Sequence, residues 1–116
     1  MAVERLRQPG QIGRLALKNR LIMAPMGTNF STSDGLSTER DRLYYELRAK
    51  GGAAAIVTEA MAVSAGGRAH NNSLWIYHDR FIPGLARLVE GIKRHDCVTV
   101  GQINHRGALL RRMVLN

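Results

Sequence analysis

Gly51-Gly52-Ala53-Ala54-Ala55-Ile56-Val57-Thr58 joins a glycine pair to an uninterrupted run of small and apolar residues. Glycine accepts the left-handed backbone conformation in which many helices end, so the pair predicts the end of a helix. An apolar run without polar alternation is typical of a parallel strand that is covered on both faces. A helix followed at once by such a strand favours a parallel α/β fold.

The sequence before the glycine pair predicts a helix over residues 39–50. Thr38 precedes this helix and Asp41 follows three positions later, which is the spacing of a capping box. Residues 27–37 are rich in Gly, Thr, Asn, Ser and Asp, so we expect a loop there.

Two further elements are predicted upstream of this loop. Residues 21–24 are apolar and predict a buried strand, which Pro25 closes. Gly13 lies between short apolar flanks and predicts a small hairpin over residues 12–17.

Downstream of the apolar run, a long loop is expected over residues 60–77. Asp79 is then positioned to cap a helix over residues 80–95, and Pro83 fits only the first turn of that helix. The apolar residues 98–103 predict a third strand.

The expected order is a hairpin followed by strand, helix, strand, helix and strand. This order forms two consecutive βαβ units, which occur both in doubly wound sheets and in (β/α)8 barrels. The connections after strands are long and those after helices are short, and barrel enzymes carry their chemistry in the loops after strands. The loop lengths therefore favour the first part of an incomplete barrel.

Composition and charge narrow the classes of protein. The chain has 116 residues, 45% of them hydrophobic, and no apolar run reaches the ~20 residues of a membrane span. The formal charge of +8 is spread without a basic block, so we expect neither nucleic acid nor membrane as partner. Cys97 is the single cysteine and is expected to be buried in a cytoplasmic protein. His70, His78 and His95 lack metal-ligand spacing, so we expect no metal site.

Several motifs near the expected strand ends resemble one family. Residues 17–28, Leu-Lys-Asn-Arg-Leu-Ile-Met-Ala-Pro-Met-Gly-Thr, resemble the opening of the Old Yellow Enzyme superfamily of NADH:flavin oxidoreductases, most closely its 2-enoate and 2,4-dienoyl-CoA reductase branch. The remaining motifs follow in the family's order, and they are Thr38-Glu39-Arg40, Tyr44-Tyr45, Arg48-Ala49-Lys50-Gly51-Gly52, Thr58-Glu59-Ala60 and Gln102-Ile103-Asn104-His105. The resemblance covers residues 6–107.

The resemblance implies an FMN-binding (β/α)8 TIM barrel, a fold that needs roughly 200 residues or more. Residues 1–116 are accordingly expected to form a partial FMN-binding domain, truncated after about the third strand. The implied activity is that of an ene-reductase, which passes hydride from NAD(P)H through FMN to an activated C=C bond of an enoate- or enone-like substrate. Any iron–sulfur cluster is expected only in sequence downstream, and the isolated chain is expected to be inactive.

The resemblance also implies which residues contact the flavin. Main-chain atoms of residues 25–27 are expected to contact the isoalloxazine, the amide of Ala60 its O4/N5 edge, and the side chain of Gln102 its pyrimidine edge. A primary amide offers both a donor and an acceptor, as that ring edge does. The expected cofactor-binding residues are Ala24, Pro25, Met26, Gly27, Thr28, Glu59, Ala60 and Gln102.

The chain departs from the family pattern in three places. Gly27 stands where relatives carry Thr, Cys or His, and Thr28 is the candidate to replace that side chain. Ala108 stands at the family's usual arginine position, with Arg106 displaced by two residues. The tail after Gly107 does not resemble the family's next loop. The family's groups for phosphate binding, substrate activation and proton donation lie later and are not found here.

Two residues and the whole chain keep alternative interpretations. Glu59 either anchors a neighbouring loop or performs acid–base work, and the anchor is favoured. His105, the one catalytic candidate, either faces the flavin or packs at the top of the barrel. The chain as a whole could instead be a non-catalytic α/β fragment that self-associates through unpaired strand edges, or a small basic nucleic-acid-binding protein.

Overall fold

The computed structural model describes residues 2–107, and its N-terminal part is a short helix and a hairpin. The helix α1 (Ala2–Arg7) was not predicted. Strands β1 (Gly10–Ile12) and β2 (Leu15–Leu17) pair antiparallel, which confirms the predicted hairpin. Gly13, with φ of 56°, lies in the turn between them, where the left-handed backbone favours glycine.

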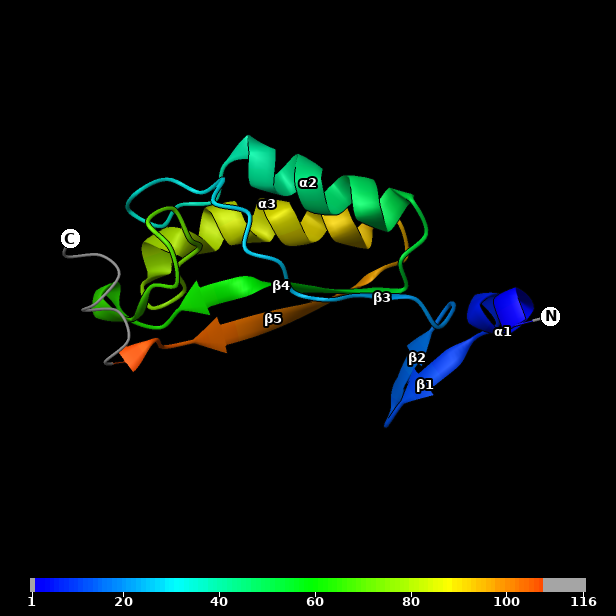
Figure 1. The fold of residues 1–116 in the computed structure, drawn as a ribbon. Coiled ribbons are helices and arrows are strands. Elements are labelled where there is room, and N and C mark those ends of the chain that lie inside the picture. The colour runs from blue at the N-terminus through cyan, green and yellow to red at the C-terminus, as the bar shows by residue number, and fades with distance from the viewer. Residues whose placement is uncertain (1, 108–116) are drawn as a thin grey trace.

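The main sheet has three parallel strands in the order β3 (Ile22–Met23), β4 (Ala55–Ala62) and β5 (Val98–Asn104). Helices α2 (Glu39–Lys50) and α3 (Ile82–Lys93) connect them and lie on one face of the sheet (Figure 1). Strands added in sequence order, with both crossover helices on one face, form the winding of a barrel, whereas a doubly wound sheet has helices on both faces. The structure confirms the predicted α/β architecture.

The other face of the sheet differs from the sequence prediction. No helix covers it among residues 2–107, so the strands are not enclosed on both faces. Ile22 and Val100 are 46% and 41% exposed as a result. The hairpin lies at the end of the sheet opposite to the strand C-termini (Figure 1). Two side-chain bonds tie that end together, from Lys18 Nζ to the carbonyl of His95 and from Asn19 Nδ2 to the carbonyl of Gly52.

Helix α2 begins and ends as the sequence predicts. The amide of Asp41 donates to the hydroxyl of Thr38 over 3.3 Å, and the amide of Thr38 donates to Oδ2 of Asp41 over 2.8 Å. This is the predicted capping box, and Asp41 is fully buried within it. After the helix, Gly52 has φ of 113°, whereas Gly51 stays in the right-handed region.

The start of helix α3 differs from the prediction. A 3₁₀ turn, η2 (Asp79–Phe81), precedes the helix, and the side chain of His78, not Asp79, accepts the amide hydrogen bond of Arg80 at 3.1 Å. Pro83 lies in the first turn as predicted. The tight turn accounts for the later start, because proline lacks an amide hydrogen and cannot stand deeper in the helix.

Strand β4 is longer than predicted and contains a bulge. It ends at Ala62, inside the segment expected to be a loop, because Ala62 still pairs with Asn104 of β5. The returning chain also bonds to this end: the amide of Ala62 donates to the carbonyl of Leu74, and the amide of Ile76 donates to the carbonyl of Ala62. A second 3₁₀ turn, η1 (Ala65–Gly67), follows the strand. Between Val57 and Ala60, strand β4 has one residue more than β5 has between the paired positions.

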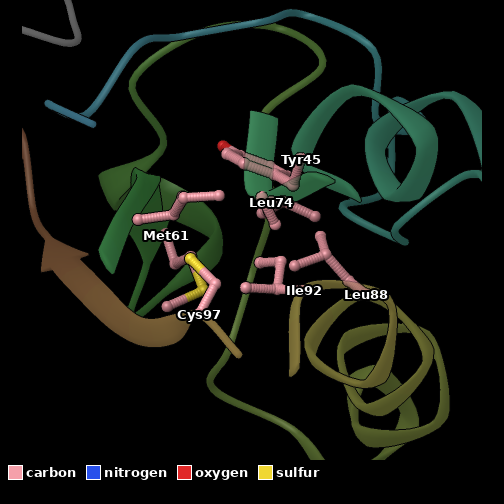
Figure 2. Packing of buried hydrophobic residues seen from close by; sticks show 8 residues of the cluster. Tyr45, Met61, Leu74, Leu88, Ile92 and Cys97 are labelled. Atoms are coloured by element: carbon pink, nitrogen blue, oxygen red, sulfur yellow. The ribbon is translucent and has the colours of Figure 1, made fainter. Parts of the chain in front are cut away.

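The core lies between the two helices and the sheet (Figure 2). Its buried residues include Tyr45, Met61, Leu74, Leu88, Ile92 and Cys97, each at most 5% exposed. Cys97 is buried as predicted. Trp75 is buried and packs against Phe81, while Tyr77 beside it is 42% exposed. Among residues 2–107, no helix is long and apolar enough to cross a membrane.

Candidate functional site

The residues expected to contact a flavin all lie toward the C-terminal ends of the three parallel strands. The segment 24–27, which follows β3, is exposed, and Met26 is 57% exposed. The loops after β3 and β4 lie at this same end of the sheet (Figure 1). Parallel α/β proteins bind ligands at this end, so the fold brings the segment to the expected position.

Ala60 and Gln102 are direct neighbours across strands β4 and β5. Gln102 is exposed, and its main-chain N–H donates to the hydroxyl of Thr58 over 3.2 Å. The β-bulge lies immediately before Ala60, and bulges re-aim the backbone next to active sites. The structure thus brings together two of the predicted site residues that lie far apart in the sequence.

The side chain of Thr28 points into the protein. Its hydroxyl donates to Oε1 of Glu59 over 2.7 Å and lies 3.3 Å from Oδ1 of Asp41. The same oxygen accepts the amide hydrogen of Phe30 at 3.2 Å. Because the hydroxyl proton is engaged internally, a contact from Thr28 to a ligand would have to use its main chain. Thr28 is therefore not a side-chain replacement for the group missing at Gly27.

Glu59 is 1% exposed and anchors the loop after β3 through Thr28, which supports the favoured interpretation. Burial raises its pKa to about 7, the hydrogen bond from Thr28 opposes this shift, and the nearby charge of Asp41 adds to it. Within residues 2–107, its buried Oε2 has no hydrogen-bond partner. Tyr45 lies behind it, accepting the amide hydrogen of Glu59 at 2.8 Å, and burial raises the pKa of this tyrosine.

His70, which from the sequence was considered only as a metal ligand, lies against Gly27. A Cβ built on Gly27 would be only 2.7 Å from Nε2 of His70, so the imidazole occupies the space next to this glycine. His70 comes from the loop after β4, and no local sequence pattern connects the two positions. The only signal in the sequence would have been a bulky residue in one loop paired with a glycine in another.

His105 follows the last residue of β5 and is exposed. Its Nδ1 accepts the amide hydrogen of Gly107 at 3.0 Å, and its ring lies against Gly67, where an added Cβ would be 2.5 Å from Cδ2. The amide of Arg106 donates to the carbonyl of Gly67 as well. These contacts favour the packing interpretation of His105. The predictions for Ala108 and the following tail lie outside the described residues.

Comparison with known proteins identifies the family. The sequence profile of the NADH:flavin oxidoreductase / NADH oxidase family matches residues 5–113 of this chain. The chain belongs to this family. The match extends six residues beyond Gly107, where the motif resemblance had ended. NADH:flavin oxidoreductases use FMN and NAD(P)H.

The similar proteins in the NADH:flavin oxidoreductase family have different enzyme names. An NADPH dehydrogenase of Bacillus cytotoxicus is 39% identical over 100 residues, which cover 85% of this chain and 29% of the relative. A 2-naphthoyl-CoA reductase in complex with 2-naphthoyl-CoA superposes with a TM-score of 0.84 at 28% identity, covering 88% of this chain and 16% of that one. Old Yellow Enzyme from Pichia sp. AKU4542 superposes with a TM-score of 0.80 at 28% identity, covering 87% of this chain and 26% of that one.

The chain corresponds to only part of each of these relatives. The chain spans less than a third of each relative's length and matches the N-terminal part of the Old Yellow Enzyme barrel. The expected 2-enoate and dienoyl-CoA branch is not resolved, because both a dehydrogenase and a CoA-ester reductase are among the similar proteins.

Proposed function

We propose that this chain is the flavin-contacting part of an FMN-dependent ene-reductase acting on an enoate- or enone-like substrate. FMN, when bound, supplies hydride transfer from NAD(P)H to the β-carbon of an activated C=C bond. The observation that carries the proposal is the pairing of Ala60 with Gln102 beside the bulge, at the same end of the sheet as the exposed segment 24–27.

The residues present fit one edge of a flat heteroaromatic ring. Gln102 is exposed and brings a primary amide, which can donate and accept along such an edge. Gly27 has no side chain of its own, so main chain can approach a ring closely there. Pro25 and Met26 are exposed in the same segment, and Ala60 adds a small residue with an amide. These residues bind and orient the ring.

Residues behind this surface hold it in place. The bond from Thr28 to Glu59 fixes the segment after β3 against strand β4. The capping box places Asp41 beside the same hydroxyl, so the start of α2 is tied to the loop as well. We assign Thr28, Glu59 and Asp41 a positioning role, and the main chain of residues 24–28 the contact with the ring.

We further propose that residues 1–116 act as a partial flavin-binding domain. The family resemblance implies that the phosphate-binding and substrate-activating groups belong to later parts of the barrel, and this chain covers 29% of the NADPH dehydrogenase. FMN should therefore bind weakly and without turnover. Measurable NAD(P)H-dependent reduction of an enone by the chain would contradict this part of the proposal.

A titration of FMN fluorescence with the chain tests the proposal. Gln102→Ala should weaken FMN binding about tenfold, since a lost hydrogen-bonding group costs about 1–1.5 kcal/mol. Gln11→Ala is the control, because Gln11 is exposed in the distant hairpin and its side chain bonds only the carbonyl of Gly13 among the described residues. No quenching of FMN by the unmodified chain, or equal effects of the two substitutions, would refute flavin binding at this surface.

The exposed edge strand β5 supports a second candidate, self-association. Ile103 on β5 is 69% exposed and Val100 is 41% exposed, and within residues 2–107 only one side of β5 pairs with another strand. Exposed apolar strand edges pair readily with other chains. Sedimentation velocity should then show dimers or larger species that increase with protein concentration. A monomer at all concentrations would eliminate this candidate.

A further inference from the structure

His70 and Gly27 are neighbours in space although they lie in different loops. The space in which a side chain of residue 27 would begin is occupied by Nε2 of His70, 2.7 Å from the position of a built Cβ. His70 is exposed, and its imidazole makes no hydrogen bond within the described residues. A polar ring atom therefore lies beside the main-chain segment that is proposed to contact the flavin, and it has no protein partner there.

Hydrogen bonds to the loop after β3 hold the segment that carries His70. The amide of Asn72 donates to Oδ1 of Asn29 over 3.1 Å, and its Nδ2 donates to the carbonyl of Ser31 over 3.0 Å. Ser73 is fully buried, and its hydroxyl donates to the carbonyl of His70 over 3.2 Å. The position of His70 above Gly27 is thus set by several bonds to its main chain and its neighbours.

The backbone of Asn29 is strained in this arrangement. Its φ of 59° lies in the left-handed region, which a residue other than glycine adopts at a cost. That backbone conformation places its side-chain oxygen where the amide of Asn72 can reach it. The strained residue is therefore part of the connection between the two loops.

We infer that His70 supplies, from the loop after β4, the ring-facing side-chain hydrogen-bond donor that Gly27 lacks in the loop after β3. The inference rests on the proposed flavin function for the identity of the ring. A neutral imidazole can carry its proton on Nε2, and an imidazolium carries one there always, so either form can donate from this atom. The acceptor would be a carbonyl or nitrogen atom on the edge of a flat heteroaromatic ring bound over residues 24–27.

The contact itself can be tested without flavin. Gly27→Ala should displace the imidazole of His70 and shift its Cε1–H resonance, while the resonances of His78 and His95 stay unchanged. Gly66→Ala is the matched control, because a Cβ at Gly66 would meet no atom within 4 Å. An unmoved His70 resonance in Gly27→Ala would overturn the inference at its first step.

The role toward a ring is tested by titrating FMN and riboflavin into variants of the chain. His70→Ala should weaken both ligands about tenfold, since they share the isoalloxazine. His70→Gln, which keeps an N–H donor, should restore most of the affinity, and His78→Ala should leave it unchanged. The His70 resonance should shift saturably with either ligand.

Each other outcome counts against a specific claim. If FMN binding is lost in His70→Ala while riboflavin binding is unchanged, His70 interacts with the phosphate and the donor assignment is wrong. If His70→Gln binds as weakly as His70→Ala, the imidazole only packs, and the assignment is again wrong. If Gln102→Ala weakens FMN binding but His70→Ala does not, the inference fails and the proposed function stands. If the unmodified chain binds neither ligand, both fail.

Discussion

The hydroxyl of Thr28 donates a 2.7 Å hydrogen bond to Oε1 of Glu59 and so links the loop after β3 to the middle strand of the sheet. The carboxyl group is 1% exposed, and within the described residues its other oxygen has no partner. A buried carboxyl that is ionised without full compensation costs stability. Because the carboxyl group is buried, its protonation state should change the free energy of unfolding of the chain.

The stability of the chain should decrease as pH rises from about 4.5 to about 7. Burial raises the pKa of Glu59 from 4.5 to about 7, so the folded chain keeps a proton that the unfolded chain releases. The stabilisation is fully present below pH 4.5 and is lost as pH rises through the folded pKa, by about 3 kcal/mol in total. Urea midpoints measured across this range should show the decline.

Glu59→Gln should flatten this pH profile, because an amide does not titrate. Glu90→Gln, at an exposed position of α3, should leave the decline in place. The explanation would be wrong if Glu59→Gln and the unmodified chain lost the same stability between these pH values.

Thr28→Val should destabilise the chain by about 1–2 kcal/mol, because it removes a donor from the buried carboxyl of Glu59 and an acceptor from the amide of Phe30. It should also raise the pKa of Glu59 further, since the bond from Thr28 is the largest of the effects that lower it. The decline in stability would then continue to higher pH. Thr28→Ser keeps the hydroxyl and should resemble the unmodified chain, and a similar loss in both variants would point to packing instead.

Gly35→Ala should cost more stability than Gly13→Ala. Both glycines have a left-handed backbone, with φ of 84° and 56°, but only at Gly35 would a Cβ lie 2.2 Å from Trp75. The backbone term is about 1–2 kcal/mol at each position, so the difference measures the contact with the indole. Trp75 is the only tryptophan, and its fluorescence should change in Gly35→Ala alone. Equal losses in the two variants would show that the indole moves away freely.

Leu88→Ala should destabilise the chain by about 2–5 kcal/mol, the usual range for a large-to-small change in a packed core. Leu88 is 1% exposed between α3 and the sheet. Leu47→Ala is the control on α2, where the side chain is 60% exposed, and it should change stability by no more than about 0.5 kcal/mol. Denaturant unfolding followed by circular dichroism gives both values, and a loss below 1 kcal/mol for Leu88→Ala would contradict the packing in Figure 2.

Elements with local signals were predictable from the sequence. Helix α2 has a capping box at Thr38 and Asp41 and a glycine pair after its last residue, so both its ends follow from nearest neighbours. The alternation of apolar runs and loops was enough to predict the order of strands and helices. The site residues Ala60 and Gln102 were found through the family resemblance, and the register of β4 and β5 places them side by side.

Features that depend on distant partners were missed or misplaced. Strand β4 continues to Ala62 because it pairs with β5 as far as Asn104 and bonds to the chain returning through Leu74, which the local sequence does not show. His78 caps the turn before α3 in place of Asp79, because Pro83 and the preceding 3₁₀ turn shift the start of the helix. The approach of His70 to Gly27 depends on the relative position of two loops, which only the folded chain defines.

The bonds from Asn72 to Asn29 and Ser31 join the loops after β3 and β4, so the two loops should be exchanged between related proteins only together. Transplanting either loop alone into a related barrel would leave an amide or a carbonyl without its counterpart, and would separate a histidine from the glycine that accommodates it. Recombination between relatives should therefore succeed when the two loops travel together, although a complete helix and strand separate them in the sequence.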